Sequence, residues 1–256
     1  MPRRARKQSS TSLYHVMSRG LNKLPVFEEI RERSRMLNLI RENVEKYNVE
    51  IYAYCIMSNH FHLLIKADLK ELASFMAKII AEFARYYNQK HNRVGFVFQG
   101  RYKSQCVENI GYFWNCLRYI HNNPLYLEEI DRIENYKYSS LKELYYNEKD
   151  ILADIVFQLV YGKFGESKEF LRFHETGSWE VFEDVSEEKE DDRLRIAREI
   201  LSQHELSKGV EAIEILDYFT FRKEYQKELI KILHVPVKKA NEIISMLKRE
   251  LKKGTG

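Results

Sequence analysis

The stretch IYAYCIMSNHFHLLIK, residues 51–66, decides the fold of this chain. Its first half is rich in β-branched and aromatic residues, which is typical of a strand. The Ser-Asn pair in the middle is typical of a turn, and a second apolar run follows it. We therefore predict a β-hairpin over residues 49–66, whose second strand carries His60 and His62 one residue apart.

The sequence on both sides of this hairpin predicts further strands and helices in a regular order. Residues 12–20 alternate as a strand does, and residues 28–48 have helical periodicity. After the hairpin we predict a helix, a strand or hairpin broken at Gly100, and a last helix, over residues 68–91, 95–107 and 109–123. This order is the split βαβ arrangement of ferredoxin-like α+β domains. We expect a four-stranded antiparallel sheet with two helices on one face, which leaves the helix 109–123 to cover the other.

Bulk composition places the chain among ordinary globular proteins. Hydrophobic residues make up 44% and charged residues 31% of its 256 residues. The basic N-terminus MPRRARKQ has no apolar stretch behind it, so it is not a secretory signal, and no run approaches the ~18 apolar residues of a membrane span. Three cysteines without a CxxC pair favour a reducing compartment. We expect a cytoplasmic protein with no membrane partner.

The chain is predicted to divide into four parts. They are a basic arm, a ferredoxin-like domain, a helical extension ending in an acidic linker, and a helical C-terminal domain, over residues 1–11, 12–148, 149–192 and 193–256. The acidic run EVFEDVSEEKEDD, residues 180–192, is interpreted as a linker or solvated segment. Residues 224–250 have the pattern helix, short turn, helix, and Lys238 and Lys239 lie in the second helix. This is either a DNA-binding helix-turn-helix or a basic surface helix that packs on a neighbour.

The histidine pair is a candidate metal site. Alternate residues of a strand share a face, so His60 and His62 project together, while Phe61 points into the core. The alternative is a pair of satisfied polar residues on a half-exposed strand. LRYIHNNP, residues 117–124, offers a third ligand in Asn123, whose carbonyl oxygen suits such a site. On a helix Tyr119 shares its face at the i, i+4 spacing, whereas His121 faces elsewhere.

Tyr119 is a candidate nucleophile above the metal site. A tyrosine hydroxyl can form a covalent intermediate, and a metal that polarises a phosphate compensates for a phenol that is mostly protonated at neutral pH. The alternative is ordinary packing, because the chain has 17 tyrosines.

Six motifs occur in an order that resembles a known family: YHVMSRG, VFEE, AYCIMSNHFHLLI, FARYYNQKH, VFQGRYKS and LRYIHNNPL. They are similar to the motifs of the single-tyrosine HUH transposases, in particular the REP-associated tyrosine transposases, and cover about residues 12–140. The resemblance implies an enzyme that cuts and rejoins single-stranded DNA with hairpin ends through a 5′-phosphotyrosine and a free 3′-OH, using Mg²⁺ or Mn²⁺. It implies that Tyr119 is the nucleophile and that His60 and His62 are metal ligands. Asn123 matches the third ligand, although some members have Gln there.

Cations near the strand ends are candidate DNA contacts. Arg19, Arg101 and Lys103 lie where a phosphate backbone could run, and solvated surface charge is the alternative for each. His15 shares its register with Arg19 and either faces the site or has a structural role. The basic arm, with Arg3, Arg4, Arg6 and Lys7, either contacts phosphates or serves as a solubilising tail.

Two other functions stay open at this stage. The same fold could bind nucleic acid without cutting it, or it could hold a metal-dependent hydrolytic nuclease that forms no covalent intermediate. The chain could act as a monomer, or as a homodimer that shares its tyrosine in trans.

Overall fold

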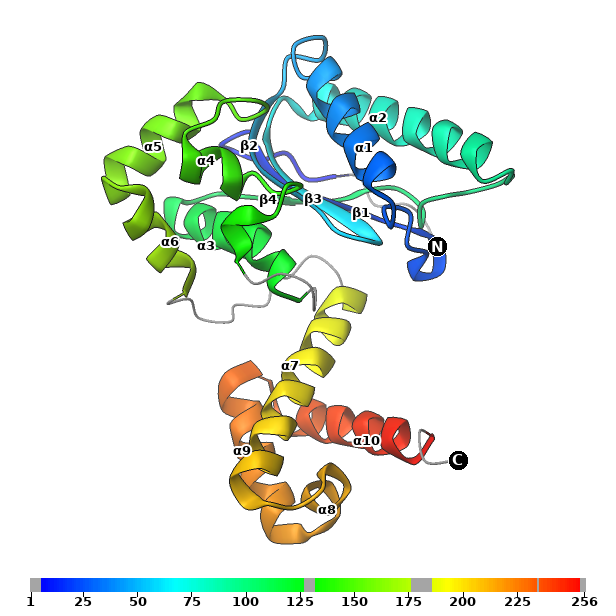
Figure 1. Cartoon of the computed structure of the whole chain (residues 1–256), viewed down its shortest axis with the longest axis vertical. Helices are drawn as coiled ribbons and strands as arrows, with labels where there is room; N and C mark the ends of the chain where they lie inside the picture. Colours follow the sequence, from blue (N-terminus) through cyan, green and yellow to red (C-terminus); the bar gives the residue numbers. More distant parts are fainter. Residues whose placement is uncertain (1–5, 127–131, 176–185, 234, 254–256) are drawn as a thin grey trace. The chain divides into compact units, whose positions relative to one another are not determined.

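The computed structural model describes residues 6–126, 132–175, 186–233 and 235–253. The chain divides into two compact units, residues 1–177 and residues 178–256 (Figure 1). Within the described residues no helix is both long enough and apolar enough to cross a membrane.

The first unit is built on a four-stranded antiparallel sheet in the order β2-β3-β1-β4. Its strands are β1 (Leu13–Arg19), β2 (Glu50–Ile56), β3 (His60–Lys66) and β4 (Lys103–Cys106). Helix α1 (Ile30–Asn43) connects β1 to β2, and α2 (Leu69–Lys90) connects β3 to β4, so two split βαβ units interlock. The predicted ferredoxin-like α+β fold is confirmed.

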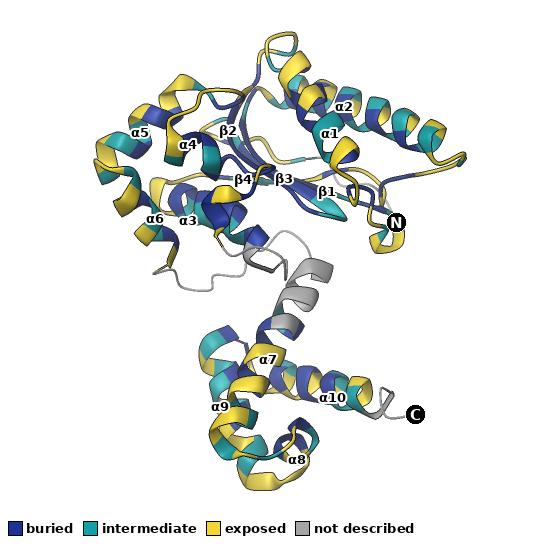
Figure 2. Cartoon of the chain, viewed as in Figure 1, coloured by how far each residue is buried: buried dark blue, intermediate teal, exposed yellow. Residues whose placement is uncertain are grey.

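Strand β3 presents different chemistry to each face of the sheet. Phe61 is fully buried and its ring contacts that of Phe27, which in turn contacts Phe83 of α2. The opposite face is covered by α3 (Ile110–Asn122), which packs on β2 and β3. The sheet is therefore buried on both faces, as its dark colour in Figure 2 shows.

Helix α3 begins and ends where its sequence dictates. The side chain of Asn109 accepts a hydrogen bond from Tyr112 N at 2.8 Å, which satisfies an otherwise unpaired amide of the first turn. The helix ends at Asn122, and Asn123, which precedes Pro124, keeps α-region dihedral angles (φ −50°, ψ −39°) and begins the 3-10 helix η2 (Asn123–Tyr126). Helix α3 lies on the free sheet face as expected.

Residues 95–107 form less strand than predicted. Only Lys103–Cys106 joins the sheet as β4, whereas Phe98 makes an isolated bridge with Gly20. Gly100 has a φ of 71°, which turns the chain away from the extended path between these two segments. Buried Val97 and Phe98 are held by packing instead, and Val97 O accepts from Leu21 N of the short helix η1 (Leu21–Lys23).

The acidic run 180–192 was expected to be a linker, but its second half is helical. Helix α7 (Ser186–Lys208) begins inside the run, and residues 180–185 lie outside the described residues. This run was interpreted as a linker or a solvated segment, and from Ser186 onward its backbone is helical.

Short helices cover the open edge of β2. They are η2 (Asn123–Tyr126), η3 (Ile133–Asn135), α4 (Leu141–Tyr146), α5 (Asp154–Phe164) and α6 (Ser167–Glu175). The backbone of β2 pairs with residues 138–140 and 153, so this edge is not left exposed.

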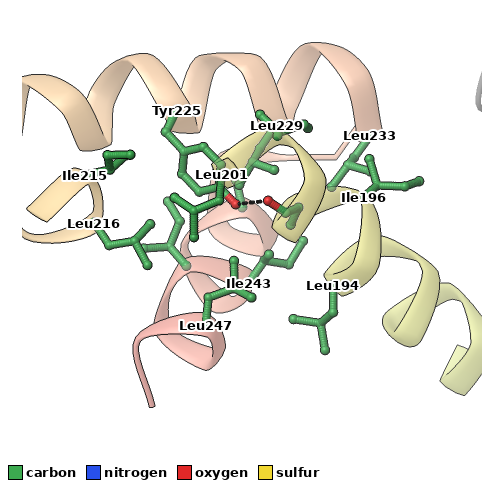
Figure 3. Packing of buried hydrophobic residues seen from close by; sticks show 14 of the residues in the cluster. Leu194, Ile196, Leu201, Ile215, Leu216, Tyr225, Leu229, Leu233, Ile243 and Leu247 are labelled. Carbon is green, nitrogen blue, oxygen red and sulfur yellow. Dashed lines mark hydrogen bonds between the residues drawn. The ribbon is translucent and has the colours of Figure 1, made fainter. Parts of the chain in front are cut away.

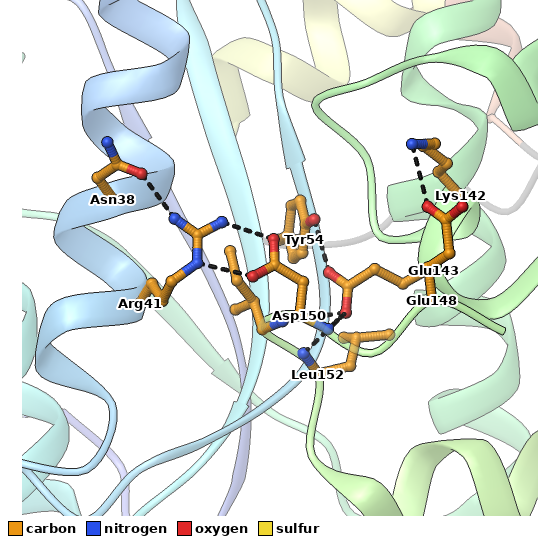
Figure 4. Close-up of polar contacts among 9 residues, drawn as sticks. Asn38, Arg41, Tyr54, Lys142, Glu143, Glu148, Asp150 and Leu152 are labelled. Atoms are coloured by element: carbon orange, nitrogen blue, oxygen red, sulfur yellow. Dashed lines mark hydrogen bonds and ion pairs between the residues drawn. The ribbon is translucent and has the colours of Figure 1, made fainter. Parts of the chain in front are cut away.

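A buried carboxylate, that of Glu143, holds the loop after α4 against β2 (Figure 4). It accepts the hydroxyl of Tyr54 at 2.7 Å and the backbone N–H groups of Asp150, Ile151 and Leu152 at 3.0–3.1 Å. Burial raises the pKa of the Glu143 carboxyl, and these four hydrogen bonds act in the opposite direction. Asp150 also pairs with Arg41 of α1, so the loop is tied to this helix as well as to β2.

We expect Glu143→Ala to lower the free energy of unfolding by roughly 3 kcal/mol, because it leaves buried donors without an acceptor. Glu148→Ala removes a carboxylate of the same loop that is exposed and paired with Lys142, and should cost below about 0.5 kcal/mol. Urea unfolding of the two variants measures both values. Equal losses would mean that Glu143 is not a structural anchor.

The second unit is a helical bundle with its own core. Its helices are α7, α8 (Ala212–Asp217), α9 (Phe219–Leu233) and α10 (Val237–Lys253). All four contribute aliphatic side chains to one cluster (Figure 3). Tyr225 is the one aromatic in this buried cluster, and its hydroxyl donates to Ala197 O at 2.6 Å, so the polar atom is satisfied inside the apolar core.

Candidate functional site

The two histidines of the hairpin lie side by side on the α3 face of the sheet. Antiparallel pairing places Met17 opposite His62 and Arg19 opposite His60, and directly paired residues share a face. The rings of His60 and His62 are 4.9 Å apart between centroids and perpendicular. His62 is fully buried and His60 is half-buried. The strand period therefore brings the two imidazoles together as predicted.

Helix α3 brings Tyr119 over this pair. The Tyr119 ring stands edge-on to His62 at 5.4 Å and to His15 at 5.8 Å between centroids. Tyr119 is half-buried, in contrast to the fully buried residues that follow it at the next core positions. A partly exposed phenol beside two imidazoles is available to a ligand that approaches the sheet.

Asn123 joins the same group from the end of α3. Its Nδ2 donates to Tyr119 O at 2.8 Å, so the side chain folds back one helical turn. The same side chain interacts with His60. Asn123 is buried, and its amide oxygen is thereby placed close to the histidine pair. Tyr119, Asn123, His60 and His62 form one cluster drawn from β3 and α3.

Neighbouring side chains fix the orientation of both imidazoles. His60 Nδ1 lies 2.6 Å from Asn59 Oδ1, which can only accept, so Nδ1 carries the proton and Nε2 is the basic nitrogen of the neutral ring. His62 Nδ1 lies 3.0 Å from His15 Nε2, and these two rings are stacked. His15 therefore faces the site, which settles the alternative that the sequence left open.

The site keeps its histidines neutral. The pKa of His60 is lowered to about 4, mainly by burial and then by the charge of Arg19, while the contact with Asn123 acts in the opposite direction. Burial and the neighbouring His60, His15 and Arg19 lower the pKa of His62 well below its ordinary value. A neutral imidazole is the form that binds a metal.

The predicted cations fall into two groups. Arg19 pairs with His60 in the register, and Lys103 pairs with Met17, so both lie on the site face of the sheet. Arg101 is exposed in the segment before β4. Lys238 and Lys239 belong to the second unit.

The basic arm is described from Arg6 onward. The guanidinium of Arg6 lies over the Tyr102 ring at 3.8 Å and donates to Tyr102 O, so this residue is packed against the domain. Arg3 and Arg4 lie outside the described residues.

Sequence reasoning missed an exposed apolar tip between α2 and β4. Val94 and Phe96 are 96% and 84% exposed in the segment between α2 and β4. Asn88 holds this tip in shape, because its backbone carbonyl accepts from Arg93 N and its side chain donates to Gly95 O. The alternating apolar residues of RVGFVF were a usable signal, but they read as buried strand.

Sequence reasoning also missed a buried histidine relay behind Tyr119. His174 Nδ1 donates to Phe170 O at 2.7 Å, so His174 Nε2 must accept from His121 Nδ1 at 2.9 Å. His121 Nε2 then accepts from Ser140 Oγ at 2.8 Å, and Ser140 Oγ accepts from Tyr54 N. Each ring carries one proton, and the relay connects β2, α3 and α6. His121 faces away from Tyr119, as predicted.

This relay predicts that acid destabilises the first unit. Burial lowers the pKa of His174 to about 4, and burial and His174 lower the pKa of His121 well below its ordinary value. The unfolded chain binds more protons than the folded chain from about pH 6.5 downward, so stability is lost as the pH falls. One such histidine contributes about 2 kcal/mol between pH ~6.5 and pH ~5. Urea unfolding at several pH values measures this effect. In His174→Gln the loss of unfolding free energy between pH ~6.5 and pH ~5 should be smaller by that amount. An unchanged loss would contradict the relay.

A second cluster of candidate metal ligands lies between α1 and α2. Carboxylate oxygens of Glu29 and Glu32 and a ring nitrogen of His91 lie within 4.8 Å of one another. The ammonium group of Lys90 pairs with Glu29 at 2.7 Å and with Glu32 at 3.0 Å. A cation already neutralises these carboxylates, so the cluster is an ion-pair network that joins the two helices.

Comparison with known proteins finds that part of this chain is similar to transposases. Residues 8–123 match the family model described as "Transposase IS200 like". The matched segment covers less than half of the chain and contains the whole sheet and the Tyr119 cluster. The second unit lies outside the match.

Two solved structures are similar to the chain. One is titled as the REP-associated tyrosine transposase bound to a REP hairpin, with a TM-score of 0.48 and 14% identity over 56% of this chain and 85% of that one. The other is described as a putative transposase from Deinococcus radiodurans R1, with a TM-score of 0.33 and 16% identity over 48% of this chain and 95% of that one. None of the curated proteins matches the chain.

Proposed function

We propose that the first unit cuts and rejoins single-stranded DNA through a covalent bond between Tyr119 and a 5′-phosphate. The observation that carries this proposal is the position of the Tyr119 ring, edge-on to His62 and one helical turn from Asn123. The match of residues 8–123 to a transposase family model supports it. Tyr119 and the histidines come from one chain, which favours a site completed in cis.

The donor set fits a divalent metal ion. His60 and His62 are neutral and at most half-exposed, and Asn59 fixes the His60 tautomer so that Nε2 is the ligand atom. Asn123 adds an amide oxygen. Two imidazoles with one oxygen favour a transition metal, so Mn²⁺ should support the reaction better than Mg²⁺. A bound cation would polarise the target phosphate and stabilise the negative charge of the transition state.

The covalent step exchanges one phosphodiester for another. Tyr119 Oη attacks the phosphorus, the bond from phosphorus to the 3′-oxygen breaks, and the phenolic proton ends on the departing 3′-OH. The products are a 5′-phosphotyrosine and a free 3′-OH. Because the number of ester bonds is unchanged, attack by another 3′-OH rejoins the strand without ATP.

The surface around Tyr119 suits an unpaired strand. Arg19 and Lys103 lie on the same sheet face and would contact phosphates. Arg101 would do the same from the segment that precedes β4. Phe96 offers an exposed ring on which an unstacked base could stack. A duplex holds its backbone in a regular path, whereas a single strand can bend into a site on a sheet.

The test uses single-stranded oligonucleotides that fold into a hairpin with single-stranded flanks. With Mn²⁺, a label at the 3′ end should become bound to the protein, while a label at the 5′ end should leave as a shorter strand with a free 3′-OH. EDTA should abolish both products and added Mn²⁺ restore them. Cleavage without labelled protein would establish a hydrolytic nuclease, and binding without cleavage would establish a binding module.

A further inference from the structure

Helices α9 and α10 are joined by residues 234–236 and pack against each other in the second unit (Figure 1). The inner face of α10 supplies the core, and its buried side chains are Ala240, Ile243, Ile244 and Leu247. The outer face repeats at intervals of three and four residues and is exposed, with Lys238, Asn241, Ser245 and Arg249. The sequence between Lys238 and Arg249 therefore separates into one apolar and one polar face.

The polar row of α10 lies between two hollows of the surface. One hollow lies along α10 itself and is lined by Lys238, Asn241, Glu242, Ser245, Met246 and Arg249. The other lies between the helices and includes Arg222, Lys223 and Gln226 of α9. Asn241 and Ser245 line both, and Gln226 donates a hydrogen bond to Asn241. The exposed polar side chains of α10 therefore lie between the two hollows.

Charge is unevenly divided within this unit. Helices α9 and α10 carry ten Lys or Arg and four Glu, whereas α7 and α8 carry five Lys or Arg and nine Asp or Glu. Some cations are used internally, since Lys248 pairs with Asp217 and Lys239 with Glu242. In the described part of the chain Lys238, Arg222 and Arg249 make no ion pair. A positively charged helix surface whose cations are not engaged in ion pairs is suited to bind a polyanion.

We propose that α9 and α10 form a second DNA-binding surface, which takes double-stranded DNA with α10 in the major groove. The major groove of B-DNA admits one α-helix, and Asn, Ser, Arg and Lys side chains can contact its base edges. Val237, which is 57% exposed at the start of α10, offers an apolar contact for a thymine methyl group. Arg222 and Lys223 on α9 would contact the flanking phosphates. This surface is independent of the chemistry at Tyr119.

The proposal separates two tasks in one chain. The first unit acts on a single strand, and the second would hold the neighbouring duplex. Lys238 is exposed on this surface, in the helix where the sequence predicted a possible DNA contact. Lys239 is half-buried and forms an ion pair with Glu242, so its contribution to DNA binding should be smaller.

The test measures binding of the full chain to a labelled duplex of about 25 base pairs, with EDTA present and at several salt concentrations. Lys238→Ala with Arg249→Ala should weaken binding about 10- to 100-fold and lower the slope of log K against log salt by about 2. Lys227→Ala with Lys231→Ala removes the same charge from exposed positions of α9 that line neither hollow, and should change affinity less than about threefold.

Two results would overturn the proposal. Equal losses in the two double variants would mean that the chain attracts DNA by net charge alone, and equal competition by double-stranded RNA or heparin would exclude a major-groove surface. Duplex binding is measured with EDTA present, where the metal-dependent cleavage proposed for Tyr119 does not proceed. That readout separates a failure here from a failure of the proposed chemistry at Tyr119.

Discussion

Tyr119→Phe is expected to remove the covalent protein–DNA adduct completely, a loss of at least about 10³-fold in the rate of strand cleavage. The variant lacks one oxygen atom, and that atom is the proposed nucleophile. The ring contacts with His15 and His62 remain, so the fold and the affinity for single-stranded DNA should be retained. Denaturing electrophoresis with DNA labelled at the 3′ end measures the adduct, and thermal unfolding checks the fold.

Tyr112→Phe is the matched control for this experiment. Tyr112 lies on the same helix two turns before Tyr119, at a spacing of seven residues that returns to the same face. It should keep the adduct at the wild-type rate. Normal adduct in Tyr119→Phe would show that another nucleophile is used. Normal cleavage without an adduct in both proteins would point to direct hydrolysis by water.

His60→Ala is expected to lower the cleavage rate on the order of 10³-fold, because several kcal/mol of metal-dependent charge stabilisation depend on the ligand. Binding of Mn²⁺ should weaken in parallel, which calorimetry or electron paramagnetic resonance measures without any DNA. Asn59→Ala leaves the ligand in place but frees its Nδ1–H, so a smaller loss of about 10- to 100-fold is expected.

The Glu29–Glu32–His91 cluster gives the control for metal binding. His91→Gln with Glu29→Gln removes two of its three ligand groups. If Mn²⁺ acts at the histidine pair, this double variant should keep both Mn²⁺ affinity and cleavage. Loss of Mn²⁺ binding here, together with normal binding in His60→Ala, would place the metal between α1 and α2 instead.

Much of the fold could be predicted because each element carries its own periodic signal. The hairpin that contains His60 and His62 and the helix predicted over residues 109–123 are local features, and the structure contains both. The strand before Gly100 was overestimated, since buried Val97 and Phe98 have strand-like composition but are held by packing on Gly20 and Leu21. Local sequence does not distinguish residues that are buried in a strand of the sheet from residues that are buried by packing outside it.

The site was predictable only where one element carries two of its groups. Strand period places His60 beside His62, and helix period places Tyr119 beside Asn123. Partners from distant segments left no periodic signal: His15 reaches His62 across two strands, and His174 reaches His121 across 53 positions. These contacts depend on the register of the sheet and on the packing of α6. Neither can be predicted from the periodicity of a single sequence.

The Ser140–His121–His174 relay has a consequence for how small a working enzyme can be. The family match ends at residue 123, yet His121, two residues after the proposed nucleophile, makes both of its side-chain hydrogen bonds with residues beyond that limit. Truncation near residue 126 would leave both ring nitrogens of His121 without these partners and loosen the last turn of α3. A chain that keeps Tyr119 in place should therefore extend through α6, which is further than the segment that the family model matches.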